Sequence, residues 1–178
     1  IVQLGGVIAH APLNIMALVT HVMPFLASQN SKTGFGGGFG PKAITEALKT
    51  FATIDAPRVF SKEYNSVEYF DRLLKDDAAL KRSGLKRHEA RFLREAIASG
   101  QLIPAQSDAI LASARGMVTS PGLRKFIDTY MLAFNRSEEM VRRITGLTAF
   151  RLEYDKQIAA GKSQTDAYDI AQKFAQDT

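Results

Sequence analysis

Hydrophobic residues recur along this chain at intervals of three and four, which is the period of an α-helix. Two stretches with this spacing are Val67, Phe70, Leu73 and Leu74, and Leu123, Ile127, Tyr130 and Phe134. Alternating β-branched residues, which are typical of strands, do not continue for more than about four positions anywhere in the sequence. The pattern therefore predicts an all-α fold.

Proline, glycine and capping residues divide this pattern into segments. We expect helices over 12–23, 41–54, 66–83, 86–99, 104–114, 121–134, 137–160 and 163–176. Gly84, Gly100 and Gly161 stand where three of these helices should end, and Ser163 stands where the last one should begin. The chain is thus predicted to be an array of short helices with glycine and proline breaks.

The predicted helix over 137–160 has one apolar face and one polar side. The apolar face is traced by Met140, Ile144, Leu147, Phe150 or Arg151, Tyr154 and Ile158. The polar side is expected to carry Arg136, Arg142 and Arg143. Gly146 and Ala149 are small enough for another helix to approach closely. This is the pattern of a helix that packs in a core.

The segment from Ile1 to Ser31 contains no charged residue, although the chain has 23 basic and 18 acidic residues. Such a segment suits a bilayer, a deep core or another subunit. Pro12 and Pro24 cut it into pieces shorter than the roughly 20 residues that span a membrane. Burial within a larger assembly is therefore favoured over a membrane span and over a segment that moves from protein into membrane. The side chains expected to contact a subunit or membrane are Ile15, Met16, Leu18, Val19 and Val22.

A glycine-rich stretch follows the uncharged segment. Its glycines, which we interpret as a hinge, are Gly34, Gly36, Gly37, Gly38 and Gly40. A phosphate-binding loop is disfavoured, because Pro41 has no N–H to offer and no strand is predicted before it. The hinge divides the chain into an uncharged segment with the hinge, 1–40, and a basic helical domain, 41–178.

The composition of the 178 residues adds two constraints. The absence of cysteine excludes disulfides and thiolate metal sites. The net charge of +5 gives a moderate preference for acidic partners. Because the sequence begins with Ile1, we expect it to be the ordered part of a longer polypeptide.

A cluster of cations lies in and before the predicted helix over 86–99. Its members are Lys81, Arg82, Lys86, Arg87, Arg91 and Arg94, interrupted only by the acidic Glu89. The last three arginines share one stripe of a helix, and such a stripe binds phosphates of nucleic acid or anionic lipid without sequence preference. Two alternatives remain open, a solvated face and an ion-pair partner for Asp71, Asp76 and Asp77.

We find no arrangement of residues that indicates catalysis. The histidines His10, His21 and His88 lack the spacing of metal ligands, and a structural role is favoured for each. Adjacent carboxylates such as Asp76 and Asp77 point about 100° apart on a helix, so they do not form one site. We therefore expect no catalytic residue, no metal site and no cofactor.

The C-terminal quarter of the chain resembles a known helical module. The residues that carry the resemblance are Ser137-Glu138, Arg142-Arg143, Thr145, Phe150-Arg151-Leu152, Gly161-Lys162-Ser163, Ala167, Ala171 and Thr178. This order is similar to a module of very large bacteriophage polyvalent proteins and of the internal virion proteins that short-tailed phages eject. The resemblance covers 137–178 and includes no catalytic signature.

The resemblance implies a non-enzymatic structural component of a phage genome-ejection assembly, which forms part of a DNA-translocating conduit across the host envelope. The implied partners are copies of the same chain, other virion proteins, DNA bound non-specifically and the host inner membrane, with no small-molecule substrate. The implied location is the virion interior and, after ejection, the host envelope. Two other interpretations are a helical nucleic-acid-binding or accessory module of a large phage virion enzyme, and an ordinary soluble helical domain.

Overall fold

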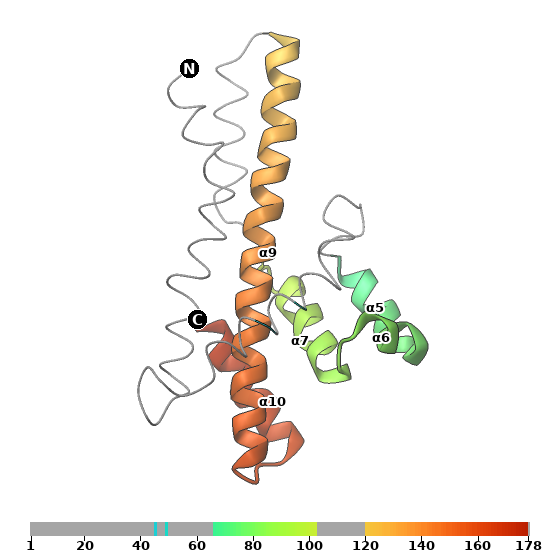
Figure 1. Ribbon diagram of the computed structural model, residues 1–178, viewed down its shortest axis with the longest axis vertical. Helices are drawn as coiled ribbons and strands as arrows, with labels where there is room; N and C mark the ends of the chain where they lie inside the picture. The colour runs from blue at the N-terminus through green and yellow to red at the C-terminus, as the bar shows by residue number, and fades with distance from the viewer. Residues whose placement is uncertain (1–44, 46–48, 50–65, 103–119, 178) are drawn as a thin grey trace.

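The computed structural model describes residues 66–102 and 120–177, together with Thr45 and Lys49. Within these residues the chain is all-α, as predicted, with five helices and no strand. The helices are α5 (Val67–Lys75), α6 (Asp77–Ser83), α7 (Arg87–Ala98), α9 (Pro121–Ala159) and α10 (Gln164–Gln176). Figure 1 shows α9 as a long rod, with α10 turned back along its C-terminal part and α5, α6 and α7 grouped beside it.

The first two helices meet at Asp76. Ser66 begins α5 by accepting a hydrogen bond from the N–H of Tyr69 (3.1 Å). The Asp76 carboxylate accepts hydrogen bonds from the N–H groups of Ala78 (2.9 Å) and Ala79 (3.0 Å). Two satisfied N–H groups at this point create a new helix N-terminus. The prediction of one uninterrupted helix over 66–83 is therefore wrong, and the chain turns at Asp76.

The predicted helix ends at three glycines are confirmed. Gly84, Gly100 and Gly161 have φ angles of 74°, 76° and 80°, a region that favours glycine. The predicted start of the last helix is also confirmed, since the Ser163 hydroxyl accepts a hydrogen bond from the N–H of Asp166 (3.1 Å). Local signals thus place these ends correctly.

The predicted break between 134 and 137 is wrong, because α9 is one helix of 39 residues. At about 1.5 Å per residue this helix is about 58 Å long, so the array is not made only of short helices. No glycine or proline lies between Phe134 and Ser137 to stop the helix. Ion pairs within one turn support it there, Arg136 with Glu139 (2.8 Å) and Arg142 with Glu138 (2.7 Å).

One hydrophobic core joins α5, α7, α9 and α10. Its buried members include Phe70, Leu73, Phe92, Leu93, Leu147, Phe150, Tyr154, Ala167, Tyr168 and Ala171. Phe150 is fully buried, with its ring centroid 4.6 Å from that of Phe92 and 5.4 Å from that of Tyr168. The predicted close approach at Gly146 is confirmed, because a Cβ there would lie 3.6 Å from the Phe92 ring. Phe150 thus connects α7, α9 and α10.

The predicted division of α9 into an apolar and a polar side is partly wrong. Met140, Ile144, Leu147, Phe150 and Tyr154 are buried as expected. Ile158, in contrast, is exposed, and Arg143, expected on the polar side, is only 2% exposed, with its guanidinium 5.8 Å from the centroid of the Phe70 ring. Every residue from Gly146 to Phe150 is also buried, so α9 has no exposed side over this stretch.

Candidate functional site

The predicted stripe of arginines on α7 is paired with acidic side chains. Arg87 forms an ion pair with Asp77 and donates a hydrogen bond to the carbonyl oxygen of Leu74 (2.9 Å). Arg94 pairs with Asp71, with 2.7 Å between Nε and Oδ1. The predicted alternative of ion pairing is thus observed for these two arginines, whereas Asp76 caps α6 instead. Contact of this stripe with nucleic acid stays a prediction.

The third arginine of the stripe belongs to a group of polar contacts between α7 and α10. The carboxylate of Glu95 accepts hydrogen bonds from Arg91 Nε (2.9 Å), from the Tyr168 hydroxyl (2.8 Å) and from the amide of Gln172 (3.0 Å). The Arg91 guanidinium lies 4.5 Å from the centroid of the Tyr168 ring. These contacts join α10 to α7.

The pKa values in this group follow from its contacts. Burial alone raises the pKa of Glu95, but the hydrogen bonds from Arg91 and Tyr168 lower it below the usual value. Burial and the bond to Glu95 raise the pKa of the Tyr168 hydroxyl well above its usual value. At neutral pH the group therefore combines a charged carboxylate with a neutral phenol that donates to it.

A buried ion pair joins α7 to α9. Arg151 donates from Nε and from its terminal nitrogen to the two oxygens of Glu89, at 2.8 Å and 3.1 Å. The Glu89 side chain is 4% exposed and that of Arg151 is 18% exposed. The same carboxylate accepts a hydrogen bond from the N–H of Lys86 (2.9 Å), at the start of α7. Glu89 thus contributes to the N-terminal cap of α7 and also holds α7 against α9.

Sequence reasoning did not assign a role to Glu89, Glu95, Arg151 or Tyr168. One signal was available, because Glu89 is the only acid within the predicted basic cluster. Its partner is 62 residues away, and the partners of Glu95 on α10 are 73 and 77 residues away. Helical periodicity describes neighbours within a few turns, so it gives no information about such pairs.

The remaining cations of the predicted cluster differ from the arginine stripe. Lys81, Arg82 and Lys86 have exposed side chains, and within the part of the chain that the structure describes they have no ion-pair partner. Lys81 and Arg82 lie in the last turn of α6, and Lys86 precedes α7. The structure therefore divides the six cations into three that are paired and three that are not.

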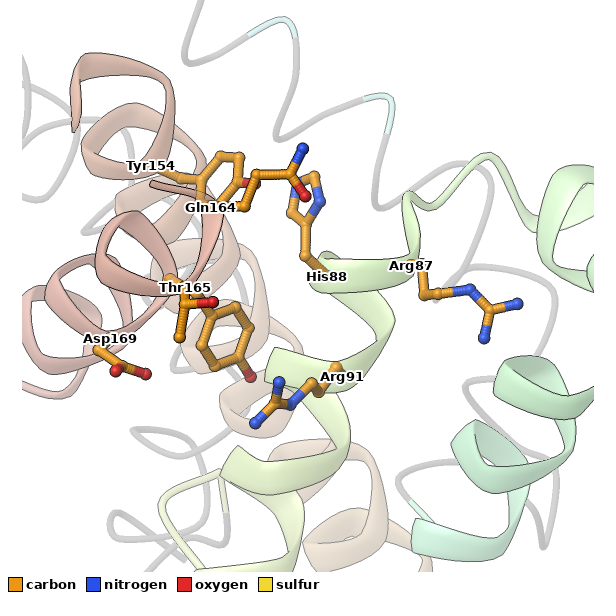
Figure 2. A pocket seen from close by; sticks show the side chains of 8 residues that line it. Arg87, His88, Arg91, Tyr154, Gln164, Thr165 and Asp169 are labelled. Atoms are coloured by element: carbon orange, nitrogen blue, oxygen red, sulfur yellow. The ribbon is translucent and has the colours of Figure 1, made fainter. Parts of the chain in front are cut away.

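A cleft of about 330 Å³ lies between the start of α7, the start of α10 and Tyr154 of α9. Figure 2 shows His88 and Gln164 close to Tyr154, while the Arg87 side chain points away from them. The imidazole of His88 stacks on the Tyr154 ring, with centroids 4.2 Å apart and an interplanar angle of 18°. Burial lowers the pKa of His88, so the imidazole is neutral at pH 7. The structural role expected for His88 agrees with this stacking.

Several predicted positions lie outside the described residues. These are the apolar contact residues Ile15, Met16, Leu18, Val19 and Val22, the hinge glycines Gly34, Gly36, Gly37, Gly38 and Gly40, and the histidines His10 and His21. Among the described residues, no helix is long and apolar enough to cross a membrane. Nor do 66–102 and 120–177 bring together three or more side chains of the types that hold a metal ion.

Comparison with known proteins gives no relative. Neither models of protein families, nor curated proteins, nor solved structures match this chain.

Proposed function

We propose that this chain is a non-enzymatic structural module of a bacteriophage genome-ejection assembly. Its partners are further copies of itself and other virion proteins, with non-specific contact to DNA and to the host inner membrane. It acts first inside the virion and then in the host envelope. The observation that carries this proposal is the position of the residues responsible for the phage resemblance, several of which lie in the core.

The aromatic-Arg-Leu end of the resembling segment contributes to packing. Phe150 is at the centre of the aromatic cluster, and Arg151 holds α7 through Glu89. Ala167 and Ala171 are fully buried, so α10 lies close to the core. A module distinguished by residues that pack helices together is suited to a scaffold, since its characteristic side chains position elements instead of contacting a substrate.

The length of α9 also supports an assembly role. Its C-terminal part contributes to the core, and the exposed residues Pro121 and Gly122 lie at its other end. A helix of about 58 Å, seen as a long rod in Figure 1, extends well beyond the core residues of its C-terminal part. Such an element is suited to contact a neighbouring subunit.

The test measures the state of assembly of the full chain by sedimentation velocity and by negative-stain electron microscopy. We expect rings or tubes. A wild-type chain that stays strictly monomeric at all concentrations contradicts the proposal.

A further inference from the structure

Four described cations with no acidic partner among the described residues lie at the ends of α5 and α6 and just before α7. These four, which we call the basic corner, are Lys75, Lys81, Arg82 and Lys86. Lys75 is in the last turn of α5, Lys81 and Arg82 are in the last turn of α6, and Lys86 precedes α7. All four side chains are exposed.

Contacts of the neighbouring residues show that these helix ends lie together. Arg87 bonds to the carbonyl oxygen of Leu74 and to Asp77, so the start of α7 lies against the junction of α5 and α6. Lys75 follows Leu74 in the chain and Lys86 precedes Arg87. The short turn through Gly84 connects the end of α6 to Lys86. Figure 1 shows α5 and α6 on the far side of α7 from α9.

The acidic residues around the basic corner are already occupied. Asp77 pairs with Arg87, Asp71 with Arg94, and Asp76 caps α6. Glu89 and Glu95, further along α7, face α9 and α10. None of these acids forms an ion pair with a cation of the corner. Asp76 places one acidic side chain next to Lys75, so the four cations leave the corner with a net positive charge.

We propose that the basic corner is a contact surface for the phosphate backbone of duplex nucleic acid. Exposed lysine and arginine side chains bind phosphates of the backbone without reading the base sequence. This surface is not the arginine stripe of α7, whose side chains are held by acids. The proposal rests on the non-specific DNA contact of the proposed function and names the surface that makes it. Its readout is DNA binding, so it can fail while the assembly proposal stands.

The surroundings of the basic corner favour nucleic acid over a membrane surface. Proteins that lie on a bilayer bury apolar side chains among the lipid headgroups. Leu80 and Leu85, next to corner cations, are buried in the protein core, and Leu74, next to Lys75, is partly buried against it. The large exposed hydrophobic residues among those described are Ile158 and Ile170, which lie on α9 and α10. The corner thus offers charge without an apolar group for insertion.

The test measures binding of the full chain to a fluorescein-labelled 20-base-pair duplex by anisotropy, across a range of NaCl concentrations. In B-DNA, each phosphate contact contributes about 0.9 to the slope of log affinity against log salt. We therefore expect Lys81→Gln/Arg82→Gln to flatten the slope by about 1.8, and Lys75→Gln/Lys86→Gln to do the same. The affinity should not depend on the base sequence of the duplex.

The matched control is Lys162→Gln/Lys173→Gln, which removes two exposed cations from the region of α10. It changes the net charge equally, and we expect the wild-type slope. Circular dichroism and thermal melting check that every variant keeps the fold. Equal slopes for the corner and control variants overturn the proposal, as does wild-type binding that is independent of salt.

Binding to vesicles of phosphatidylglycerol and phosphatidylcholine tests whether the basic corner binds the phosphates of lipid headgroups instead of those of nucleic acid. We expect the corner variants to lose DNA affinity with no comparable change in vesicle binding. If Lys81→Gln/Arg82→Gln abolishes vesicle binding and leaves DNA binding unchanged, the surface belongs to a membrane contact and the proposal is wrong. The state of assembly is measured separately, so failure here leaves the assembly proposal standing.

Discussion

Replacing Arg151 by methionine tests how strongly the buried ion pair joins α7 to α9. The substitution removes the two hydrogen bonds to Glu89, at 2.8 Å and 3.1 Å. It leaves a carboxylate that is 4% exposed, with the Lys86 N–H as its remaining partner among the described residues. Removing one member of a buried ion pair costs about 3–5 kcal/mol, because the other charge stays buried. Arg151 is itself 18% exposed, which admits some water, so we take the lower end, about 3 kcal/mol.

The assay is urea and thermal unfolding followed by circular dichroism. For a chain of this size each kcal/mol lowers the melting temperature by about 2–4 °C, so we expect a decrease of about 6–12 °C. The matched control is Arg87→Met, which makes the same chemical change in an ion pair whose side chains are 60% and 85% exposed. Exposed pairs contribute about 0–1 kcal/mol, so the control should change little.

The double variant Glu89→Gln/Arg151→Met removes the stranded charge. The amide keeps an oxygen that accepts from the Lys86 N–H, so most of the lost free energy of unfolding should return. We expect the costs of the two single substitutions to exceed the cost of the double by about 2 kcal/mol, a typical coupling for residues in contact. The reasoning is refuted if Arg151→Met costs no more than Arg87→Met, or if the single costs simply add.

Two further predictions concern glycine and histidine. Ala at Gly161, where φ is 80°, should lower the free energy of unfolding by about 1 kcal/mol because of backbone strain. Gly122→Ala, in open space within α9, should raise the free energy of unfolding by about 0.5 kcal/mol in the same urea titration. A change of the same sign in both glycine variants contradicts this prediction. Burial lowers the pKa of His88 in the folded protein below 6.5, so protonation favours the unfolded chain. The folded state therefore loses stability as the pH falls below about 6.5. Wild type should therefore lose stability relative to His88→Phe between pH 7 and 5, and a relative gain on acidification contradicts the assignment.

The sequence predicts those features of the fold that depend on a few neighbouring residues. Gly84, Gly100, Gly161 and Ser163 mark helix ends because φ > 0 and an N-cap hydroxyl are local requirements. The false break before Ser137 arose because serine caps helices well, yet a cap residue does not stop a helix that nothing else interrupts.

Long-range pairing explains what the sequence did not reveal about the candidate site. The arginine stripe of α7 was identified as a stripe, but the partners of Arg87 and Arg94 lie on α6 and α5 and depend on how those helices pack against α7. The burial of Arg143 similarly depends on Phe70, which belongs to another helix. The periodicity of a single helix indicates which residues share a face, but it does not indicate how many other helices cover that face.

The ion pair between Glu89 and Arg151 also sets an order of events during synthesis. Arg151 is added 62 residues after Glu89. At about 5–20 residues per second, the ribosome adds this residue roughly 3–12 s later. When α7 leaves the ribosome, the carboxylate of Glu89, which is buried in the folded protein, is therefore still hydrated. The ion pair that holds α7 against α9 can therefore form only after the second half of α9 has left the ribosome.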